Sequence, residues 1–389
     1  MSDLIEYRNE IDEIDKEIVK LFEKRMEVVI NVAKYKLNNE IPILNSGREN
    51  IVIEKNKEYL NNNDLNDSLE EFFKNLMMVS RNYQSKKISS WKSKDVINYG
   101  MKEETINEVI NGKINIVYQG VPGSFSSIAL NEFFRQELDA DNINKINVEN
   151  FSDVFKALED DKIQYGILPI ENSSTGAVTA TYDLLRNNDY YIVGERKIKV
   201  NHYLMGLKGS KLDDIKEVYS HPQALEQSKT FLNKYSDWKM IPYRNTATSA
   251  KFIKENNDIT KAAIASIETK EIYDLDILAS NINYNKNNYT RFVIIGKKLV
   301  QNKNNNKISV VLSVQHESGA LFNALKVFWK NKLNMVKIES RPMINKPWEY
   351  FFYIDFEGNI QDDLVKKSME ELKKESHYFK VLGNYKADL

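Results

Sequence analysis

Apolar residues in the first 90 positions recur every three or four residues, the spacing of an amphipathic helix. In the first stretch they are Leu4, Ile11, Ile14, Ile18, Leu21, Val28 and Val32. The pattern predicts one long helix, a second over residues 48–60 and a third over residues 65–87, with a polar break at residues 61–64. Residues 1–90 are therefore expected to form an all-α bundle.

The pattern changes after a polar, irregular stretch at residues 91–113, which we interpret as a linker. From residue 114 short apolar runs alternate with helical stretches, which is typical of an α/β fold. The runs lie at residues 114–118, 165–169, 190–193, 262–265 and 292–295. We expect one α/β domain over residues 114–297.

A second polar break at residues 303–307 precedes a last domain, residues 308–387. Strands are expected over residues 308–315, 336–342, 350–356 and 380–385, and helices over residues 320–331 and 361–375. This βαββαβ order predicts a ferredoxin-like unit. The chain is therefore multidomain, with an all-α, an α/β and a ferredoxin-like part.

Composition and charge narrow the classes of partner. The 389 residues include 55 Lys and Arg against 56 Asp and Glu, and a net charge of −1 favours neither nucleic acid nor an anionic membrane. No apolar run approaches the roughly 20 residues of a membrane span, and the acidic N-terminus is unlike a signal peptide. With no cysteine and four scattered histidines, we expect no metal site and a reducing, cytoplasmic compartment.

Three cations interrupt the apolar stripe of the first helix: Arg8, Arg25 and Lys36. A buried, unpaired cation is strongly destabilising, so each needs a partner. Either they snorkel or pair with glutamates of other helices, or they hold a polyanionic ligand inside the bundle. Arg25 and Lys36 lie about 16 Å apart on nearly one face, whereas Arg8 lies about 25 Å from Arg25. Arg8 can reach the same small ligand only from a second, antiparallel chain, which predicts a dimer.

Five short motifs carry a resemblance in this region: Arg8-Asn9-Glu10-Ile11, Glu23-Lys24-Arg25, Lys34-Tyr35-Lys36, Arg48-Glu49, and Ser80 with Gln84. Together they resemble the all-helical chorismate mutase domain. The resemblance implies contacts to the substrate carboxylates from Arg8 and Arg25, to the ether oxygen from Lys36 and Gln84, to the ring hydroxyl from Glu49, and to the rest of the pocket from Asn45, Arg48 and Ser80. Lys36 and Gln84 are the implied catalytic pair.

The chemistry fits these residue types. A Claisen rearrangement needs no acid, base or nucleophile, only a compactly held substrate and stabilisation of the charge that grows on the ether oxygen. Two alternatives stay open. The family usually has an acidic residue at Asn45, so activity falls if that carboxylate matters, and the helical part would then serve only for dimerisation. Glu49, in the pattern Ser46-Gly47-Arg48-Glu49, can instead close a capping box.

Five ordered motifs mark the α/β region. They are residues 120–126, 168–178, 219–225, 246–250 and 289–293. The first two follow strands and precede helices, where backbone N–H groups bind anions, although such turns also serve as plain connections or caps. Over residues 114–297 the motifs resemble prephenate dehydratase. The resemblance implies two α/β lobes, like a type-2 solute-binding protein, with the site in the cleft and chain crossings near residues 190 and 275.

The resemblance also implies the dehydratase site. The essential residue is Thr290, and Asn172 ranks beside it, with Glu171 as a further catalytic residue. The remaining implied substrate contacts are Ser173, Thr175, Gly176, Ser220, His221, Gln227, Arg291 and Phe292. Arg291 is alternatively a structural ion pair, and for His221 a cap before Pro222 is the favoured alternative. Two positions depart from the family pattern, since Val121 precedes Pro122 and Ser127 stands where histidine is common.

The last domain opens its first helix with Gly319-Ala320-Leu321 and ends its second strand with Glu339-Ser340-Arg341-Pro342. Taken singly, a helix-start glycine and a surface arginine explain Gly319 and Arg341. At this spacing the motifs resemble the phenylalanine-binding segments of the ACT regulatory domain, which implies an effector site at a dimer interface. The helix N-terminus suits a carboxylate.

The resemblances together imply a bifunctional, cytoplasmic enzyme without cofactors. It would convert chorismate to prephenate and prephenate to phenylpyruvate, under feedback inhibition by L-phenylalanine, as a homodimer or higher homo-oligomer. The competing hypothesis is a non-catalytic scaffold that responds to a small molecule. That hypothesis predicts the loss of Thr290 or Asn172, and both are present.

Overall fold

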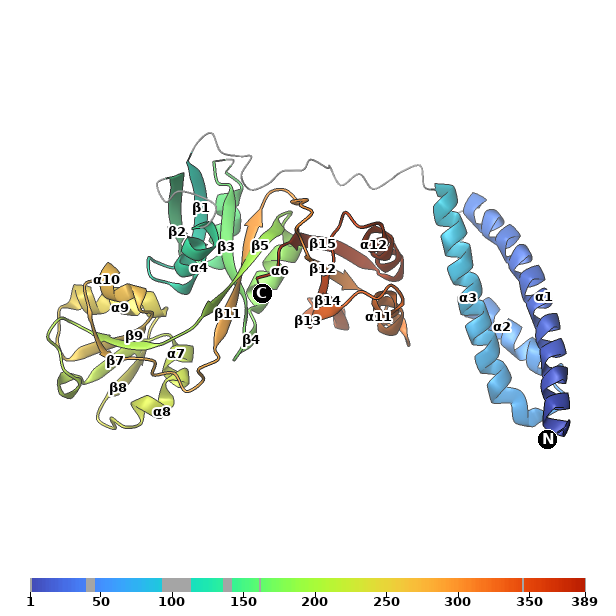
Figure 1. Cartoon of the computed structure of the whole chain (residues 1–389), viewed down its shortest axis with the longest axis horizontal. Helices are drawn as coiled ribbons and strands as arrows, with labels where there is room; N and C mark the ends of the chain where they lie inside the picture. The colour runs from blue at the N-terminus through green and yellow to red at the C-terminus, as the bar shows by residue number, and fades with distance from the viewer. Residues whose placement is uncertain are drawn as a thin grey trace. The chain divides into compact units, whose positions relative to one another are not determined.

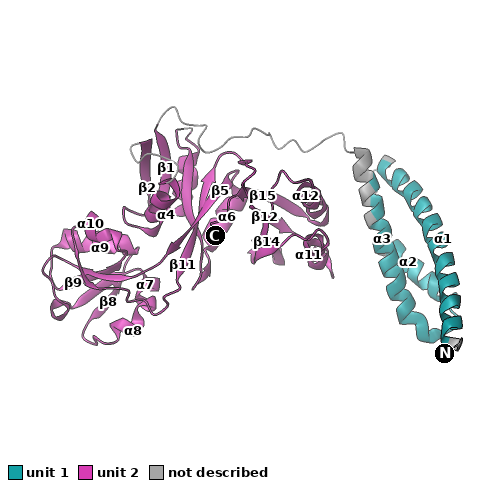
Figure 2. Ribbon diagram, viewed as in Figure 1, with its two compact units in different colours: residues 1–101 teal, residues 102–389 magenta. Residues whose placement is uncertain are grey.

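The computed structural model describes residues 2–39, 46–92, 113–135, 142–160, 162–344 and 346–388. The chain divides into two compact units, residues 1–101 and residues 102–389 (Figure 2). Asn45 and most of the predicted linker lie outside the described residues.

The first unit is all-helical, as the spacing predicts. Its elements are α1 (Ser2–Asn38), α2 (Ser46–Lys57), the short 3-10 helix η1 (Asn63–Leu65) and α3 (Asn66–Lys92). The third helix extends beyond the predicted end at residue 87, to Lys92. The core between the helices is small and contains Met26, Ala33, Ile53 and Met77. Five predicted stripe residues of α1 stay 48–67% exposed: Leu4, Ile11, Ile14, Ile18 and Leu21.

The second unit begins with a mixed α/β lobe (Figure 1). Its strands are β1 (Ile114–Gln119), β2 (Ile143–Val148), β3 (Tyr165–Asn172), the short β4 (Gly176–Ala177), β5 (Tyr191–Lys199) and β11 (Tyr289–Gly296). Its helices are α4 (Phe125–Phe134), α5 (Phe151–Leu158) and α6 (Thr179–Asn187). β11 pairs antiparallel with both β3 and β5, so the end of the α/β region returns to the middle of the first sheet.

A second lobe is inserted between β5 and β11. Its sheet has the order β10-β6-β9-β7-β8. The strands are β6 (Tyr203–Gly206), β7 (Glu217–Ser220), β8 (Lys239–Pro242), β9 (Lys261–Ala265) and β10 (Asp276–Ala279). The helical segments are η4 (Leu212–Asp214), α7 (Pro222–Gln227), α8 (Lys229–Leu232), α9 (Thr246–Asn256) and α10 (Glu268–Ile272).

The predicted crossings between lobes, near residues 190 and 275, are wrong by about one strand. The apolar run at residues 190–193 continues as β5 to Lys199 and pairs with β11 of the first lobe. Likewise β10 pairs with β6 inside the second lobe. The chain therefore crosses at residues 200–202 and returns at residues 280–288. Strand pairing, which the local pattern does not report, sets these positions.

The C-terminal domain has the predicted βαββαβ order. Its elements are β12 (Lys307–Ser313), α11 (Ala320–Lys330), β13 (Met335–Met343), β14 (Lys346–Glu357), α12 (Asp363–Glu375) and β15 (Tyr378–Tyr385). The strand order is β13-β14-β12-β15, with β13 at the edge. Both helices pack against the sheet through one core that includes Phe328, Phe356 and Leu372 (Figure 1).

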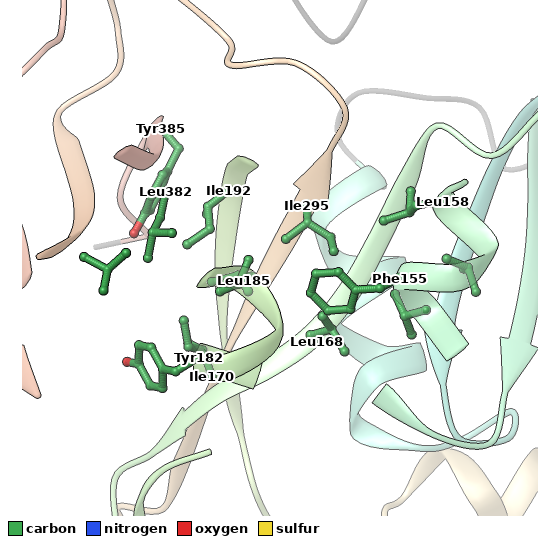
Figure 3. Packing of buried hydrophobic residues seen from close by; sticks show 14 of the residues in the cluster. Phe155, Leu158, Leu168, Ile170, Tyr182, Leu185, Ile192, Ile295, Leu382 and Tyr385 are labelled. Atoms are coloured by element: carbon green, nitrogen blue, oxygen red, sulfur yellow. The ribbon is translucent and has the colours of Figure 1, made fainter. Parts of the chain in front are cut away.

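The C-terminal domain and the first lobe share a sheet and a core. β15 pairs with β5 where Gly383 faces Ile192, which joins the two sheets into one of ten strands. A Cβ atom on Gly383 would lie 2.2 Å from the Ile192 carbonyl oxygen, so only glycine permits this approach. Figure 3 shows Leu382 and Tyr385 beside Ile192 in the same apolar cluster. The C-terminal domain and the first lobe therefore form one continuous structure.

Candidate active sites

The helical unit brings three predicted mutase residues together between α1 and α3. Arg25, which is partly buried, donates a hydrogen bond to the Ser80 hydroxyl, and Ser80 donates to the Leu76 carbonyl at 2.6 Å. Gln84 lies one turn further along α3, is 7% exposed, and its Oε1 has no hydrogen-bond partner among the described residues. Burial lowers the pKa of Arg25. An arginine and an amide oxygen with unused bonding capacity therefore line the same interior face.

Other predicted mutase residues lie farther out. Glu49 forms an ion pair with Arg81 of α3, so its carboxylate has a partner besides the backbone N–H group that a capping box would supply. Lys36 is partly buried at the end of α1, and Arg48 is exposed at the start of α2. Arg8 is exposed near the other end of α1, about 25 Å from Arg25 along the helix. A single chain therefore does not bring Arg8 to the Arg25 group.

A large groove of about 1000 Å³ also runs between α1 and α3. Its apolar lining comes from Phe22, Met26, Ile30, Val79 and Tyr83. None of the predicted mutase residues that the structure describes lines it. The groove and the exposed stripe of α1 together leave a substantial apolar surface of this unit uncovered.

In the second unit, Thr290 and Asn172 are paired across neighbouring strands. They face each other in the register of β11 and β3, and Asn172 Nδ2 donates to Thr290 Oγ1 at 2.9 Å. Asn172 Oδ1 in turn accepts from the backbone N–H groups of Ser174 and Thr175, at 3.0 and 3.1 Å. The loop after β3 therefore fixes the amide, and the amide fixes the threonine hydroxyl.

A cavity of about 160 Å³ lies between the two lobes at this pair. The first lobe and the crossing segments supply Phe125, Asn172, Val200, His202 and Thr290, and the second lobe supplies His221, Gln223, Ala224, Gln227, Asn245 and Thr246. Gln223 Nε2 donates across the cleft to Thr175 Oγ1 at 2.9 Å. Thr290, Asn172, His221 and Gln227 are thus gathered from distant parts of the sequence.

His221 combines two of its predicted roles. It is the N-cap of α7, because its Nδ1 accepts from the Gln223 N–H at 3.3 Å, and it also lines the cavity. Burial lowers the pKa of His221. The cap therefore presents an imidazole that favours its neutral form at the cleft.

Glu171 and Arg291 face away from this cavity, which differs from the expectation that both reach the substrate. They are the next residues along β3 and β11, and side chains of a strand alternate between faces. Arg291 donates to Glu195 and Asp355, each at 2.7 Å, and to the Tyr385 hydroxyl at 2.9 Å. Burial alone would lower the pKa of Arg291, but its anionic neighbours outweigh burial and raise it. Arg291 therefore forms a structural ion pair, which was the alternative to a substrate contact.

Four more predicted contacts have structural partners. Phe292 is 2% exposed in the core of the first lobe, and Ser220 is fully buried and donates to the Ile264 carbonyl at 2.7 Å. Ser173 accepts from the Tyr289 N–H at 2.9 Å, and Gly176 adopts a positive φ of 82° in the loop after β3. These residues shape the walls and loops of the cleft rather than its cavity surface.

The glycine-rich loop at residues 120–126 lines a second part of the cleft. This space of about 590 Å³ is bounded by Gly120, Val121, Glu149, Arg244 and Asn245, among others. Arg244 and Glu149 form an ion pair of 2.7 Å between the lobes, and both side chains are more than 60% exposed. Asn245 borders both cavities, which makes them adjoining parts of one cleft.

The two motifs of the C-terminal domain have different neighbours. Gly319 is exposed, has a φ of 82° and begins α11 with Ala320 and the partly buried Leu321 behind it. On the edge strand β13, Ser340 and Pro342 are exposed and Glu339 is partly buried. Arg341 donates to Asp183 of α6 at 2.7 Å. The predicted effector strand thus contacts the first lobe.

Comparisons with known proteins cover both units. The family model for chorismate mutase type II matches residues 7–85, and the model for prephenate dehydratase matches residues 116–300. The bifunctional chorismate mutase/prephenate dehydratase of Buchnera aphidicola subsp. Schizaphis graminum is 32% identical over 100% of this chain and 97% of its own. This chain belongs to that bifunctional family.

Solved structures match the second unit. A prephenate dehydratase of Arthrobacter aurescens, in complex with L-Phe, has a TM-score of 0.63 and 27% identity, over 70% of this chain and 90% of that one. A protein described as a novel type of quorum quenching acylase has the same TM-score and identity, over 98% of its chain.

Family membership assigns both activities to the chain. It is a bifunctional enzyme of phenylalanine biosynthesis that rearranges chorismate to prephenate and converts prephenate to phenylpyruvate. Within the described ranges, no helix has the length and apolar character to cross a membrane.

His202 and Asn288 were not among the predicted site residues. His202 is 2% exposed and lines the cavity, and Asn288 is 1% exposed and bonds to Asn172. Both lie in the segments that connect the lobes, at residues 200–202 and 280–288. The signal that could have identified them is a group of polar side chains in the two crossing segments. The predicted crossings, near residues 190 and 275, lay too early in the chain to include that group.

Proposed function

We propose that residues 1–90 carry the mutase site, residues 114–297 the dehydratase site, and residues 308–387 an ACT-type sensor of L-phenylalanine. We also propose a homodimer and a cytoplasmic location, which suits a chain without cysteine. The observation that carries the dehydratase assignment is the Thr290–Asn172 pair at the cavity between the lobes.

In the dehydratase step, Thr290 donates a proton toward the hydroxyl of prephenate that leaves. Its Oγ1 accepts from Asn172 Nδ2, and among the described residues it donates to no acceptor, so its own O–H is available to the substrate. The C–O bond breaks with its electron pair on oxygen, while the ring carboxylate leaves as CO2 and returns its electron pair to the ring. Formation of the aromatic ring drives the step. The proton from Thr290 completes water at the leaving oxygen, and a proton from solvent restores the threonine hydroxyl.

In the mutase step, cations and an amide hold chorismate compactly. We assign Arg25 to a carboxylate and the Gln84 amide N–H, with Lys36, to the ether oxygen, because Arg25 and the buried Gln84 lie on one interior face of α1 and α3. We assign Glu49 and Arg48 of α2 and Ser80 of α3 to the rest of the pocket. Charge that grows on the ether oxygen is stabilised without any proton transfer.

A second copy of the chain completes this site in our proposal. Arg8 lies about 25 Å from Arg25 of its own chain, and an antiparallel helix of a second copy would bring that copy's Arg8 close to Arg25. The apolar stripe and the groove of this unit supply the surface that the partner covers. Burying large apolar side chains such as Leu4 and Ile11 would stabilise the dimer by roughly 25 cal/mol per Å².

For the sensor, we propose that L-phenylalanine binds at Gly319 and the edge strand β13. The strand order with β13 at the edge leaves its backbone and its exposed Val336 and Ile338 available for pairing with a second copy. Ion pairs connect β13 to the dehydratase lobe, from Lys337 to Glu171 at 2.7 Å and from Arg341 to Asp183 at 2.7 Å.

These contacts suggest how the sensor influences the cleft. Glu171 precedes Asn172 on β3, and Arg291 follows Thr290 on β11, so each catalytic residue has a neighbour held by the C-terminal domain. A ligand that shifts β13 would shift the positions of both strands. Inhibition then requires only that L-phenylalanine bind one arrangement more tightly than the other.

The test supplies chorismate to the purified full-length chain and follows phenylpyruvate, with and without L-phenylalanine. The proposal expects phenylpyruvate to form and L-phenylalanine to suppress it. Consumption of prephenate but not of chorismate would reject the mutase assignment and point to Asn45. Phenylpyruvate formation that L-phenylalanine leaves unchanged would reject the sensor.

A further inference from the structure

The cavity that contains Thr290 has no charged side chain among its described lining residues. Its two histidines, His202 and His221, have their pKa lowered by burial, which favours the neutral imidazole. Prephenate, the substrate, carries two carboxylates, and one of them remains on the product. The uncharged cavity therefore offers no cation to the charge that remains.

One cation lines the adjoining cavity of the same cleft. Among the described residues that line either cavity, Arg244 is the only cation and Glu149 is the only anion. Arg244 follows β8 in the second lobe, and the next residue, Asn245, borders both cavities. Arg244 is therefore adjacent in the chain to the wall that the two cavities share.

The guanidinium of Arg244 has donors left for a ligand. Its Nη1 donates to Glu149 across the cleft at 2.7 Å, whereas Nε and Nη2 bond to no described residue. The Arg244 side chain is 76% exposed, so these N–H groups are accessible from the cleft. Arginine presents its N–H groups as a planar fork that matches the two oxygens of a carboxylate. One edge of the fork is therefore free to bind a carboxylate while Glu149 stays paired.

The start of helix α9 adds to the positive charge at this place. The helix has 11 residues, and its N-cap Asn245 accepts from the Thr248 N–H at 2.7 Å. Thr246 lines the first cavity and Thr248 the second, so α9 begins where the cavities meet. The partial charge of a helix N-terminus supplements Arg244 and would not by itself hold the carboxylate.

The two carboxylates of prephenate differ in what the reaction does to them. The ring carboxylate leaves as CO2 and loses its charge, so a cation bound to it would stabilise the ground state and slow the step. The carboxylate of the pyruvyl side chain keeps its charge throughout. Both are attached at the ring carbon opposite the hydroxyl, but the side-chain carboxylate extends farther from the ring. With the hydroxyl at Thr290, the side chain is the part that can extend into the adjoining cavity.

We propose that Arg244 binds the side-chain carboxylate of prephenate through Nε and Nη2, while Glu149 keeps the guanidinium directed across the cleft. The ring carboxylate then lies in the uncharged part of the cleft, where no cation opposes the loss of its charge. Arg244 is thus a substrate-binding residue that selects for an acidic side chain. It also determines which of the two carboxylates is free to leave.

This inference rests on the proposed cleft site, and two variants that remove the same ion pair test it in the full-length chain. Arg244→Met removes the cation that binds the substrate. Glu149→Gln leaves the guanidinium in place and removes an anion from the neighbourhood of the carboxylate. Because both partners of the pair are exposed, both variants should fold, which circular dichroism and the urea midpoint report.

The measurement is prephenate turnover, followed by the release of CO2, with and without added phenylpyruvate. This product retains only the side-chain carboxylate. A contact that is equal in the substrate and the transition state changes KM rather than kcat, so Arg244→Met should raise KM about tenfold and leave kcat within about twofold. The inhibition constant of phenylpyruvate should rise by about the same factor. Neither constant should rise in Glu149→Gln.

Three results would overturn the inference. An unchanged KM in Arg244→Met would mean that Arg244 does not bind the substrate. An equal rise of KM in both variants would mean that the ion pair acts only by holding the lobes together. A raised KM with an unchanged inhibition constant for phenylpyruvate would place Arg244 at the ring carboxylate instead.

A parallel variant separates this inference from the site assignment. If Thr290→Ala converts prephenate at the native rate, the cavity is not the dehydratase site and both proposals fail. If Thr290→Ala is folded but inactive and Arg244→Met keeps the native KM, only the assignment of Arg244 fails.

Discussion

Replacing Arg291 with Met should destabilise the second unit strongly. The guanidinium is paired with Glu195 and Asp355, whose side chains are 0% and 10% exposed. Among the described residues, Glu195 would keep Lys307 at 2.6 Å, whereas Asp355 would keep the Ser309 hydroxyl but no cation. Leaving one buried charge unpaired costs about 3–5 kcal/mol, or roughly two to four orders of magnitude in the ratio of folded to unfolded chain.

Urea denaturation followed by circular dichroism measures this change in the free energy of unfolding. Two further variants make the result specific. Arg244→Met removes an ion pair of the same 2.7 Å length whose side chains are 76% and 67% exposed, and it should cost no more than about 1 kcal/mol. The double variant Arg291→Met with Asp355→Asn removes both charges and should recover most of the lost stability.

A cost of Arg291→Met as small as that of Arg244→Met would contradict the role of Arg291 as a buried ion-pair partner. A double variant as unstable as the single one would contradict it as well. The first result would mean that solvent screens the network, and the second that the lost packing of Arg291, rather than the unpaired Asp355, sets the cost.

Three further changes have defined outcomes. Arg25→Ala should abolish chorismate turnover and spare prephenate turnover, because the two sites use separate units; retained chorismate turnover in a rate assay would contradict this. Lys337→Met should raise the L-phenylalanine concentration for half inhibition by about fivefold or more, whereas Lys346→Met, which removes only a local pair with Glu349, should not. Burial lowers the pKa of His202, so the unfolded chain binds more protons and the urea midpoint should fall as pH drops below about 6.5. That fall should be smaller in His202→Asn, and equal falls in both would be contrary to the reasoning.

The local pattern predicted the elements well. Helical spacing in the first 90 residues and the βαββαβ order of the last domain both match the structure, because helix periodicity and strand alternation are properties of short segments. The motif around Asn172 and the one around Thr290 also pointed to residues that the fold pairs at 2.9 Å.

The sequence did not predict what each face of the two central strands contacts. Alternation along β3 and β11 requires Glu171 and Arg291 to point opposite to Asn172 and Thr290, but it does not say what covers each face. The pairing of β15 with β5 places Asp355 and Tyr385 against Arg291. A residue that resembled a substrate contact is thereby an internal ion pair.

The sequence by itself predicted the helices of the first 90 residues, the βαββαβ order of the last domain, the family and the proposed catalytic pair, since these reside in local spacing and in motifs of a few residues. Only the tertiary structure decided where the chain crosses between lobes, and hence that His202 lies at the cleft. Strand pairing between segments about 90 residues apart, β5 with β11, sets that crossing. Such pairing depends on contacts summed over the whole lobe, and no window of sequence contains them.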